Sequence, residues 1–406
     1  MKLNRLLTTG LLLAAGLTAS AAGIKTMRNG QITFTDKTAE GNEIRIVFNR
    51  CMANNLYTFQ SVLLDGVEVN HTDSDNIGPF LIGTGWVGGN HTNPDATGTQ
   101  VQSAKTVSVE AYIDGEKINT SAIKNYTGDV LTVKVVNTLY MPGQSVETFA
   151  TETMTYIVAG NSIDVTGEHA FSCTTPQTID RYYGMQSMFI GETEVLTPGG
   201  KYSTWTPIAS VDRFTHMSAP NFNTFIEHSA NGYQAAWMES SPGLLGNRLL
   251  VPDNDVVFIG NSYGKSYHKI IGSHSVKAGD KTTWHGVYTW YKTPVADNCR
   301  GSQAGTYSYR GTLGGVPTLF TLDADGTCTV APECSAGIDN TVGGGDGNIP
   351  FARSGAGCIT VSNAPAATVY SLTGTALHHG EGIVYCHPGI YIVSDGKGRS
   401  VKLLVK

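Results

Sequence analysis

The residues best suited to chemistry in this sequence are tyrosines, histidines and cations that alternate along strand-like segments of its middle third. A period of two places Tyr263, Lys265, Tyr267 and Lys269 on one face of a strand. Residues on one face of a sheet can reach a common ligand. Aromatic rings stack on the apolar faces of sugars, and cationic side chains bond hydroxyl or carboxylate groups. The pattern therefore favours a secreted carbohydrate-active protein with a polysaccharide as its partner.

Cleavage of an acidic, uronate-containing polysaccharide by β-elimination would use three of these residue types. A cation or amide must neutralise the carboxylate, a base must remove the C5 proton, and an acid must protonate the leaving oxygen. We predict a polysaccharide lyase in which Tyr and His act as base and acid. The predicted catalytic residues are His91, Tyr267, His268, Tyr183 and His216. The predicted substrate-binding residues are Asn90, Trp86, Arg181, Arg213, Lys265, Lys269 and Trp290.

A glycine-rich segment, residues 73–91, lies between strand-like stretches and carries two acids, a tryptophan and an Asn–His pair. Glycines let the backbone approach a ligand closely, and loops of this composition often carry function. We expect this segment to form one wall of a cleft whose other wall spans residues 181–291. His91 is the residue to mutate first. The competing interpretation is a tight turn whose tryptophan closes the end of a sandwich.

No metal-binding or cofactor motif is present, so we expect no cofactor. Asp73, Asp75 and Asn76 could contribute to a Ca²⁺ site, because closely spaced acids and amides suit that ion. The full twelve-residue calcium loop is missing.

Two other classes of function remain open. A glycoside hydrolase would need two facing carboxylates, and no two of the available acids have a diagnostic spacing. Those acids are Glu227, Glu239, Asp212, Asp73 and Asp75. A non-catalytic glycan-binding or cell-surface protein would use the same aromatic face as a stacking platform. A lyase makes an ultraviolet-absorbing product, a hydrolase makes only reducing ends, and a binding protein makes neither.

The elements that must position these residues are β-strands. Polar and apolar residues alternate from residue 31 to residue 332, short turns separate the segments, and no helix of three turns is visible. We predict an all-β chain with a large antiparallel two-sheet β-sandwich, similar to a supersandwich, over residues 23–335. Two smaller sandwiches meeting near Asn161 are the alternative.

The totals agree with an exported β protein. The chain has 406 residues, with 48 Gly, 18 Tyr and only 15% charged residues. Residues 1–22 have the charged start, short apolar core and small residues of a signal peptide, and no transmembrane segment is expected. A net charge of −6 makes nucleic acid an unsuitable partner. Of seven cysteines, Cys328 and Cys334 flank a short turn and could form a disulfide.

A glycine-rich linker, residues 336–352, separates this region from about fifty residues of short strands, which we predict to form a second, small β-sandwich at 353–406. Residues 369–374, 388–393 and 397–406 resemble the strands of the C-terminal sorting domain of type IX secretion substrates. The match departs from that family in having no residue between Pro388 and Gly389. The resemblance implies a bacterial protein that is secreted or held at the cell surface, with the export machinery as a partner of this domain.

Overall fold

The computed structural model describes residues 21–51, 53–72, 75–191, 194–212, 215–217, 223–239, 243–244, 256–259, 264–333, 352–355, 358–362, 364–371, 376–386, 389–397 and 399–405. Within these ranges the chain is built from β-strands, with one short 3-10 helix, η1 (Ile208–Ser210). Every strand pairing given for these residues is antiparallel. The described part of the chain contains no helix long and apolar enough to cross a membrane. The all-β prediction is confirmed.

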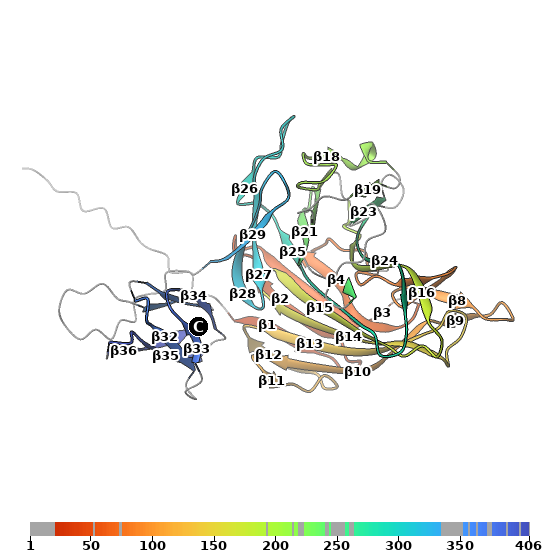
Figure 1. The fold of residues 1–406 in the computed structure, drawn as a ribbon, viewed down its shortest axis with the longest axis horizontal. Coiled ribbons are helices and arrows are strands. Elements are labelled where there is room, and N and C mark those ends of the chain that lie inside the picture. The colour runs from red at the N-terminus through yellow and green to blue at the C-terminus, as the bar shows by residue number, and fades with distance from the viewer. Residues whose placement is uncertain are drawn as a thin grey trace, which may run out of the picture.

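Two sheets form one layer of the large unit (Figure 1). Sheet A has the order β12 (Lys124–Gly128), β1 (Ala22–Thr26), β2 (Ile32–Lys37), β3 (Glu43–Cys51), β4 (Leu56–Leu64), β5 (Val67–Glu68). Sheet C has the order β19 (Thr215–Met217), β23 (Val256–Ile259), β24 (Lys265–Val276), β16 (Gln177–Ser187), β6 (Phe80–Ile82), β7 (Gly85–Val87). Isolated bridges from Asn70 to Phe189 and from Ile77 to Met185 join the segment after sheet A to sheet C.

An eleven-stranded sheet, sheet B, forms the facing layer. Its main path is β11 (Glu116–Lys117), β10 (Ala104–Ile113), β13 (Leu131–Tyr140), β14 (Thr148–Ala159), β15 (Ser162–Phe171), β25 (Lys281–Tyr291), β21 (Gly232–Met238), β20 (Thr224–Ser229), β17 (Glu194–Leu196), β18 (Thr206–Pro207), and β22 (Gly243–Leu244) also pairs with β25. The pairing of β15 with β25 brings strands from both sides of Asn161 into one sheet. A separate hairpin consists of β8 (Thr92–Pro94) and β9 (Gln100–Gln102).

The core lies between sheet B and the layer made of sheets A and C. In β3, Ile44, Ile46 and Phe48 are fully buried while the residues between them face outward, as a period of two requires. Phe48 meets Tyr156 of sheet B edge-on, with ring centroids 5.3 Å apart. From sheet B, Trp284 donates a hydrogen bond of 2.8 Å to the Tyr182 hydroxyl of sheet C.

A four-stranded sheet, sheet D, adds a third layer. It consists of β26 (Ala296–Asp297), β27 (Tyr307–Leu313), β28 (Val316–Leu322) and β29 (Cys328–Pro332). Its inward rings share a second core with the outer side of sheet B, where Tyr291 stacks on Tyr309 and Tyr309 on Phe320 at about 5 Å. Cys328 is a free thiol, so the disulfide that Cys328 and Cys334 could have formed is not present.

The C-terminal strands form two small sheets with their own apolar core. One sheet has the order β30 (Ala352–Gly355), β31 (Cys358–Val361), β34 (Gly382–Tyr385), and the other β33 (Ala376–His379), β32 (Thr368–Ser371), β35 (Gly389–Ser394), β36 (Ser400–Val405). The three segments that resemble a sorting domain therefore contain the neighbouring strands β32, β35 and β36. Residues 1–20 of the expected signal peptide and 336–351 of the expected linker lie outside the described residues.

Candidate functional site

Most of the predicted site residues meet on the outward face of sheet C, in a group that we call the Asp75 cluster. It consists of Asp75, Trp86, His91, Arg181, Tyr183, Lys265, Tyr267 and Lys269. Six of these side chains form a closed circuit of contacts. Lys265 Nζ lies 2.5 Å from Asp75 Oδ1 and 5.2 Å from the centre of the Tyr267 ring. The ring centres are 4.7 Å apart for Tyr267 and Tyr183, 6.1 Å for Tyr183 and Trp86, and 5.3 Å for Trp86 and His91. His91 Nε2 lies 3.6 Å from Asp75 Oδ2, which closes the circuit. Three chain segments that are far apart in sequence supply them.

Strand β24 supplies one side of the cluster, because every second side chain along it points to the same face. Lys265, Tyr267 and Lys269 point to the same face, as the sequence predicts from a period of two. Lys265 lies over the Tyr267 ring, with its nitrogen 5.2 Å from the ring centre. Lys269 is the register partner of Tyr183 on the neighbouring strand β16.

Strand β16 supplies Arg181 and Tyr183, which lie two positions apart and share a face. Its pairing with β24 shifts on both sides of Tyr183. Such bulges are frequent beside functional sites. Tyr182, between Arg181 and Tyr183, points into the core, where it stacks on Phe80 at 3.9 Å. Tyr183 faces the cluster with Arg181, whose Nη1 donates a hydrogen bond of 3.2 Å to the Tyr183 hydroxyl.

The segment from Asp75 to Pro79 runs against this irregular part of β16, and Gly78 makes the approach possible. A side chain at Gly78 would place its Cβ 1.6 Å from the Tyr183 carbonyl oxygen. Gly78 donates a hydrogen bond to the Gly184 carbonyl, and Gln186 donates one to the Asn76 carbonyl. The glycine in this segment is thus a packing requirement that brings Asp75 to sheet C.

Asp75 and Lys265 form a buried ion pair across 190 positions of the sequence, with Nζ 2.5 Å from Oδ1. Their side chains are only 4% and 8% exposed. Burial by itself would raise the pKa of Asp75, but the Lys265 ammonium, the His91 ring and the Asn90 N–H outweigh it and lower that pKa below its usual value. The Asp75 carboxylate therefore stays ionised, and it holds the loop against β24.

His91 is the exposed member of this electrostatic group, with 38% of its side chain accessible. Its Nε2 lies 3.6 Å from Asp75 Oδ2. Burial lowers the pKa of His91, Asp75 raises it, Lys265 lowers it, and the net effect is a pKa below the ordinary value. The imidazole is therefore neutral near pH 7, and it stacks on the half-buried Trp86 ring.

Four predicted site residues are placed elsewhere or act differently. His268 is fully buried on the opposite face of β24, against Phe225, because adjacent strand residues point to opposite faces. Trp290 is fully buried in the core beside Phe59. The Asn90 side chain accepts a hydrogen bond from the Ala53 N–H, so its amide oxygen fixes the loop. His216 lies in β19, and only its backbone is described.

Arg213, Asp73 and Tyr263 lie outside the described residues. Asp75 is the member of the cluster that the substrate-binding and catalytic predictions left out. The available signal was an acid in a glycine-rich segment together with two lysines, Lys265 and Lys269, on one face of a strand.

The candidate carboxylates do not form a facing pair at this cluster among the described residues. Glu227 is fully buried and accepts hydrogen bonds from Ser187 and Ser266. Glu239 bonds His285, and Asp212 pairs with Lys201. The Asp75 oxygens face Lys265 and the Asn90 N–H, which leaves them poorly placed for a Ca²⁺ ion. No group of three or more His, Cys, Asp or Glu within the described ranges could hold a metal.

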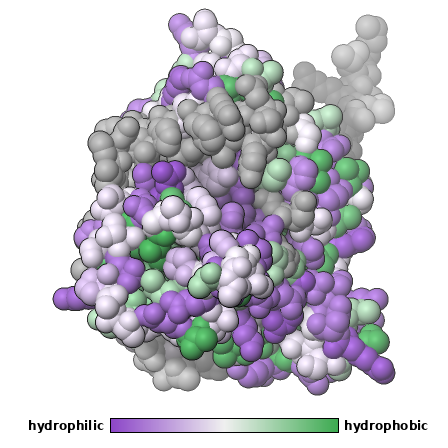
Figure 2. Space-filling model, turned by 90° about the vertical axis from the view of Figure 1, so that its right-hand side faces the viewer, coloured by the Kyte–Doolittle hydropathy of each residue, from purple (hydrophilic) through white to green (hydrophobic). Residues whose placement is uncertain are grey.

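The structure thus has a cluster of aromatic, basic and neutral-histidine side chains on a large antiparallel sandwich. Trp86, His91 and Arg181 are partly exposed, and the other members are buried. Figure 2 shows the side of the molecule that carries β8, β9 and β16 at the right of Figure 1. In Figure 2, hydrophilic residues on that face are interspersed with intermediate and hydrophobic ones.

No protein-family model and no curated protein matches the chain. Among solved structures it is similar to the galactosidase domain of the α-galactosidase–sucrose kinase AgaSK, at 10% identity and a TM-score of 0.39, over 65% of this chain and 41% of that one. It is also similar to the GH36 α-galactosidase AgaA from Geobacillus stearothermophilus (9% identity, TM-score 0.38, 64% and 41% covered). A third is a glycoside hydrolase family 97 enzyme from Pseudoalteromonas sp. strain K8 (11% identity, TM-score 0.36, 64% and 36% covered).

The names of these three proteins describe enzymes that act on carbohydrate. The chain spans less than half of the length of each. With TM-scores below 0.5, the likenesses carry no argument about the site of this chain.

Proposed function

We propose that the protein binds an acidic, uronate-containing polysaccharide at the Asp75 cluster and cleaves it by β-elimination. The observation that carries this proposal is the hydrogen bond from Arg181 to the Tyr183 hydroxyl in a cluster that also holds neutral His91. The cluster supplies a base, an acid and a cation, of which His91 and Arg181 are partly exposed and Tyr183 is largely buried. β-Elimination requires these three kinds of group.

Each residue has a role that follows from its contacts. His91 is neutral and partly exposed, so it can accept the C5 proton of the sugar. The Tyr183 oxygen accepts from Arg181, which leaves the Tyr183 proton to be donated to the leaving oxygen. Arg181 is partly exposed beside Tyr183 and would neutralise the uronate carboxylate. Trp86 offers a ring for stacking on the sugar.

Lys265 has a different role, because its ammonium is already paired with Asp75 in a buried position. We assign this pair to positioning: it holds the loop that carries Trp86 and His91 against β24. Asp75 also lies beside His91, so its negative charge would stabilise the imidazolium that forms when His91 accepts a proton.

The test is incubation of the full chain with soluble uronate polymers (alginate, polygalacturonate, hyaluronan and chondroitin sulfate) while absorbance of the unsaturated product is followed. An absorbance rise that is lost in Tyr183→Phe and His91→Gln supports the proposal. New reducing ends without an absorbance rise would identify a hydrolase. Binding without either signal would identify a glycan-binding protein, for which the Trp86–His91 stack is the specific favouring feature.

We also propose that the protein is exported through its N-terminal segment and handled by secretion machinery through residues 353–406. The resemblance of those residues to sorting-domain strands supports it. Deletion of residues 353–406 should leave the protein inside the cell envelope, as measured by fractionation of the producing bacterium. Release of the truncated chain at the normal level would contradict it.

A further inference from the structure

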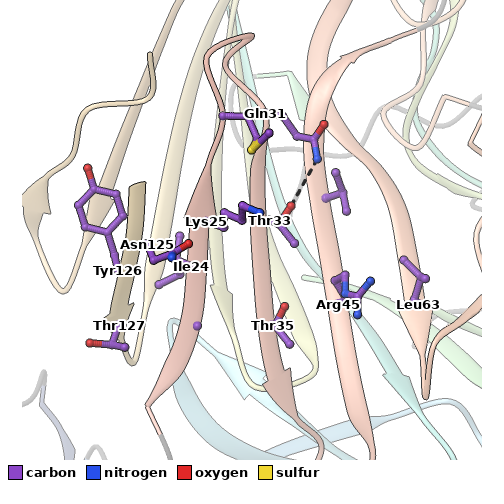
Figure 3. Close-up of a pocket in the computed structure, with 13 residues that line it drawn as sticks. Ile24, Lys25, Gln31, Thr33, Thr35, Arg45, Leu63, Asn125, Tyr126 and Thr127 are labelled. Atoms are coloured by element: carbon purple, nitrogen blue, oxygen red, sulfur yellow. Dashed lines mark hydrogen bonds between the residues drawn. The ribbon is translucent and has the colours of Figure 1, made fainter. Parts of the chain in front are cut away.

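A hollow of about 720 Å³ lies on the outward face of sheet A, and we call it the N-terminal hollow (Figure 3). A volume of this size is within the range of ligand sites, roughly 300–1,000 Å³. Strands β12, β1, β2, β3 and β4 all contribute to it. With strands about 4.8 Å apart, it extends roughly 19 Å across the sheet. This length suits a chain-like ligand lying across the strands.

Two rows of side chains line the hollow, and the strand register defines them. One row consists of Asn125, Lys25, Thr33 and Val47 as successive register partners. The next row consists of Thr127, Gly23, Thr35, Arg45 and Leu63. None of them is buried, and those on β1 and β3 alternate with buried core residues. Figure 3 shows Lys25, Thr33, Thr35 and Arg45 following one another across three neighbouring strands.

Gly23 interrupts the second row. It has no side chain to fill the space between Thr127 and Thr35, and it is exposed near the start of β1. A Cβ at this position would meet only the Thr35 carbonyl oxygen, at 4.0 Å. Glycine in a strand lowers stability, and neither a tight contact nor a left-handed backbone requires it here. A close approach of a ligand to the backbone accounts for it.

The chemistry of the lining points to an anionic, hydroxyl-rich ligand. Among its residues are two cations, Lys25 and Arg45, and no carboxylate, although the whole chain has a net charge of −6. Threonine hydroxyls and the Asn125 and Gln31 amides add donors and acceptors. Arg45 pairs with the exposed Glu43 at 3.1 Å, and such surface pairs are weak, so the guanidinium retains donors for a ligand.

We propose that the N-terminal hollow is a non-catalytic binding site for an acidic polysaccharide chain. The lining holds no histidine, and its one tyrosine, Tyr126, lies at the β12 edge under the Lys124 ammonium, so the hollow has no acid–base pair for cleavage. The choice of a uronate polymer as occupant rests on the proposed function. The hollow would hold a distant stretch of the polymer that the Asp75 cluster cleaves, and so raise its local concentration.

The test is native gel electrophoresis of the full chain in gels containing polygalacturonate or chondroitin sulfate, with dextran as the neutral polymer. The wild type should be retarded by an acidic polymer and not by dextran, and retardation should weaken as salt rises. Lys25→Ala combined with Arg45→Ala should raise the Kd roughly tenfold, the scale for two exposed ion contacts. Lys105→Ala, an exposed lysine on β10 of the opposite layer, is the matched control and should change nothing.

Gly23→Val is the second variant, and it guards against loss of folding. Valine suits a strand and has space here, so the variant should unfold at the same or higher urea concentration while it loses retardation. Equal retardation of Gly23→Val, the double variant and the wild type would overturn the proposal. So would equal retardation by dextran, or no retardation by either acidic polymer.

The two proposals fail separately. If retardation depends on Lys25 and Arg45 but no polymer gives an absorbance rise, the lyase proposal fails and the proposal for the hollow stands. If the hollow variants show the same absorbance rise as the wild type on both the polymer and a short oligosaccharide, the proposal for the hollow is overturned. If both hold, the hollow variants lose activity on the polymer alone, and Tyr183→Phe loses activity but remains retarded.

Discussion

The Asp75 cluster and the N-terminal hollow lie on outward faces of the same layer, yet they are built in opposite ways. The cluster joins segments up to 190 positions apart and contains a buried ion pair. The hollow comes mainly from strands that follow one another in the sequence, and its cations are exposed or half-exposed. Chemistry on a proton needs desolvated, fixed groups, whereas reversible holding of a polymer needs accessible ones.

The largest expected difference concerns activity. Tyr183→Phe removes the proposed proton donor and keeps the ring that contacts Trp86 and Tyr267. We expect kcat on a uronate polymer to fall roughly 100- to 10,000-fold, the usual worth of an acid–base group. Retardation in the polymer gel should not change. A variant with near-normal kcat would show that Tyr183 only packs.

The next difference concerns stability. Lys265→Met leaves the Asp75 carboxylate buried without its cation and should cost about 3–5 kcal/mol in the free energy of unfolding, measured with urea. Lys25→Met in the hollow is the control, and it should stay within about 0.5 kcal/mol of the wild type because that side chain is exposed.

A double variant separates the charge from the packing of Lys265. Asp75→Asn combined with Lys265→Met removes both charges and should be more stable than Lys265→Met alone, because no unpaired charge is then buried. If the single and the double variant lose the same free energy of unfolding, the ion pair does not anchor the loop.

Two glycines should respond with opposite signs. Gly89 has φ +52°, and a Cβ there would lie 2.4 Å from Asp75 Oδ2. Gly89→Ala should therefore destabilise the fold by about 1–3 kcal/mol. Gly23→Ala should stabilise it by about 0.5–1 kcal/mol, since alanine is preferred to glycine within a strand. If both variants changed the stability in the same direction, Gly89 and Gly23 would not differ as a packed and an open glycine.

The smallest effect concerns pH. The lowered pKa of His91 means that its imidazole is protonated at a lower pH than an ordinary histidine. Activity should therefore decline as pH falls, with a midpoint below the ordinary histidine pKa of about 6.5. Binding in the hollow depends on Lys25 and Arg45 and should not show this decline. A midpoint at or above about 6.5 would contradict the neutral-base role of His91.

Much of the strand pattern could be predicted, because each strand shows its buried face as a period of two in the sequence. The same rule placed Lys265, Tyr267 and Lys269 together. It also placed His268 on the opposite face, although that residue was proposed as catalytic beside Tyr267. That the segment from Asp75 to Pro79 runs against β16 could not be predicted, since this contact depends on long-range packing.

The sequence by itself determined the β-strand content, the alternation of each strand and the glycines that permit close approaches, because these depend on neighbouring residues. Only the tertiary structure decided that Asp75 pairs with Lys265, that Trp86 and His91 lie over β16 and β24, and that Trp290 belongs to the core. The physical reason is that burial and long-range pairing depend on how the sheets stack, and no local pattern encodes which distant strand will lie alongside.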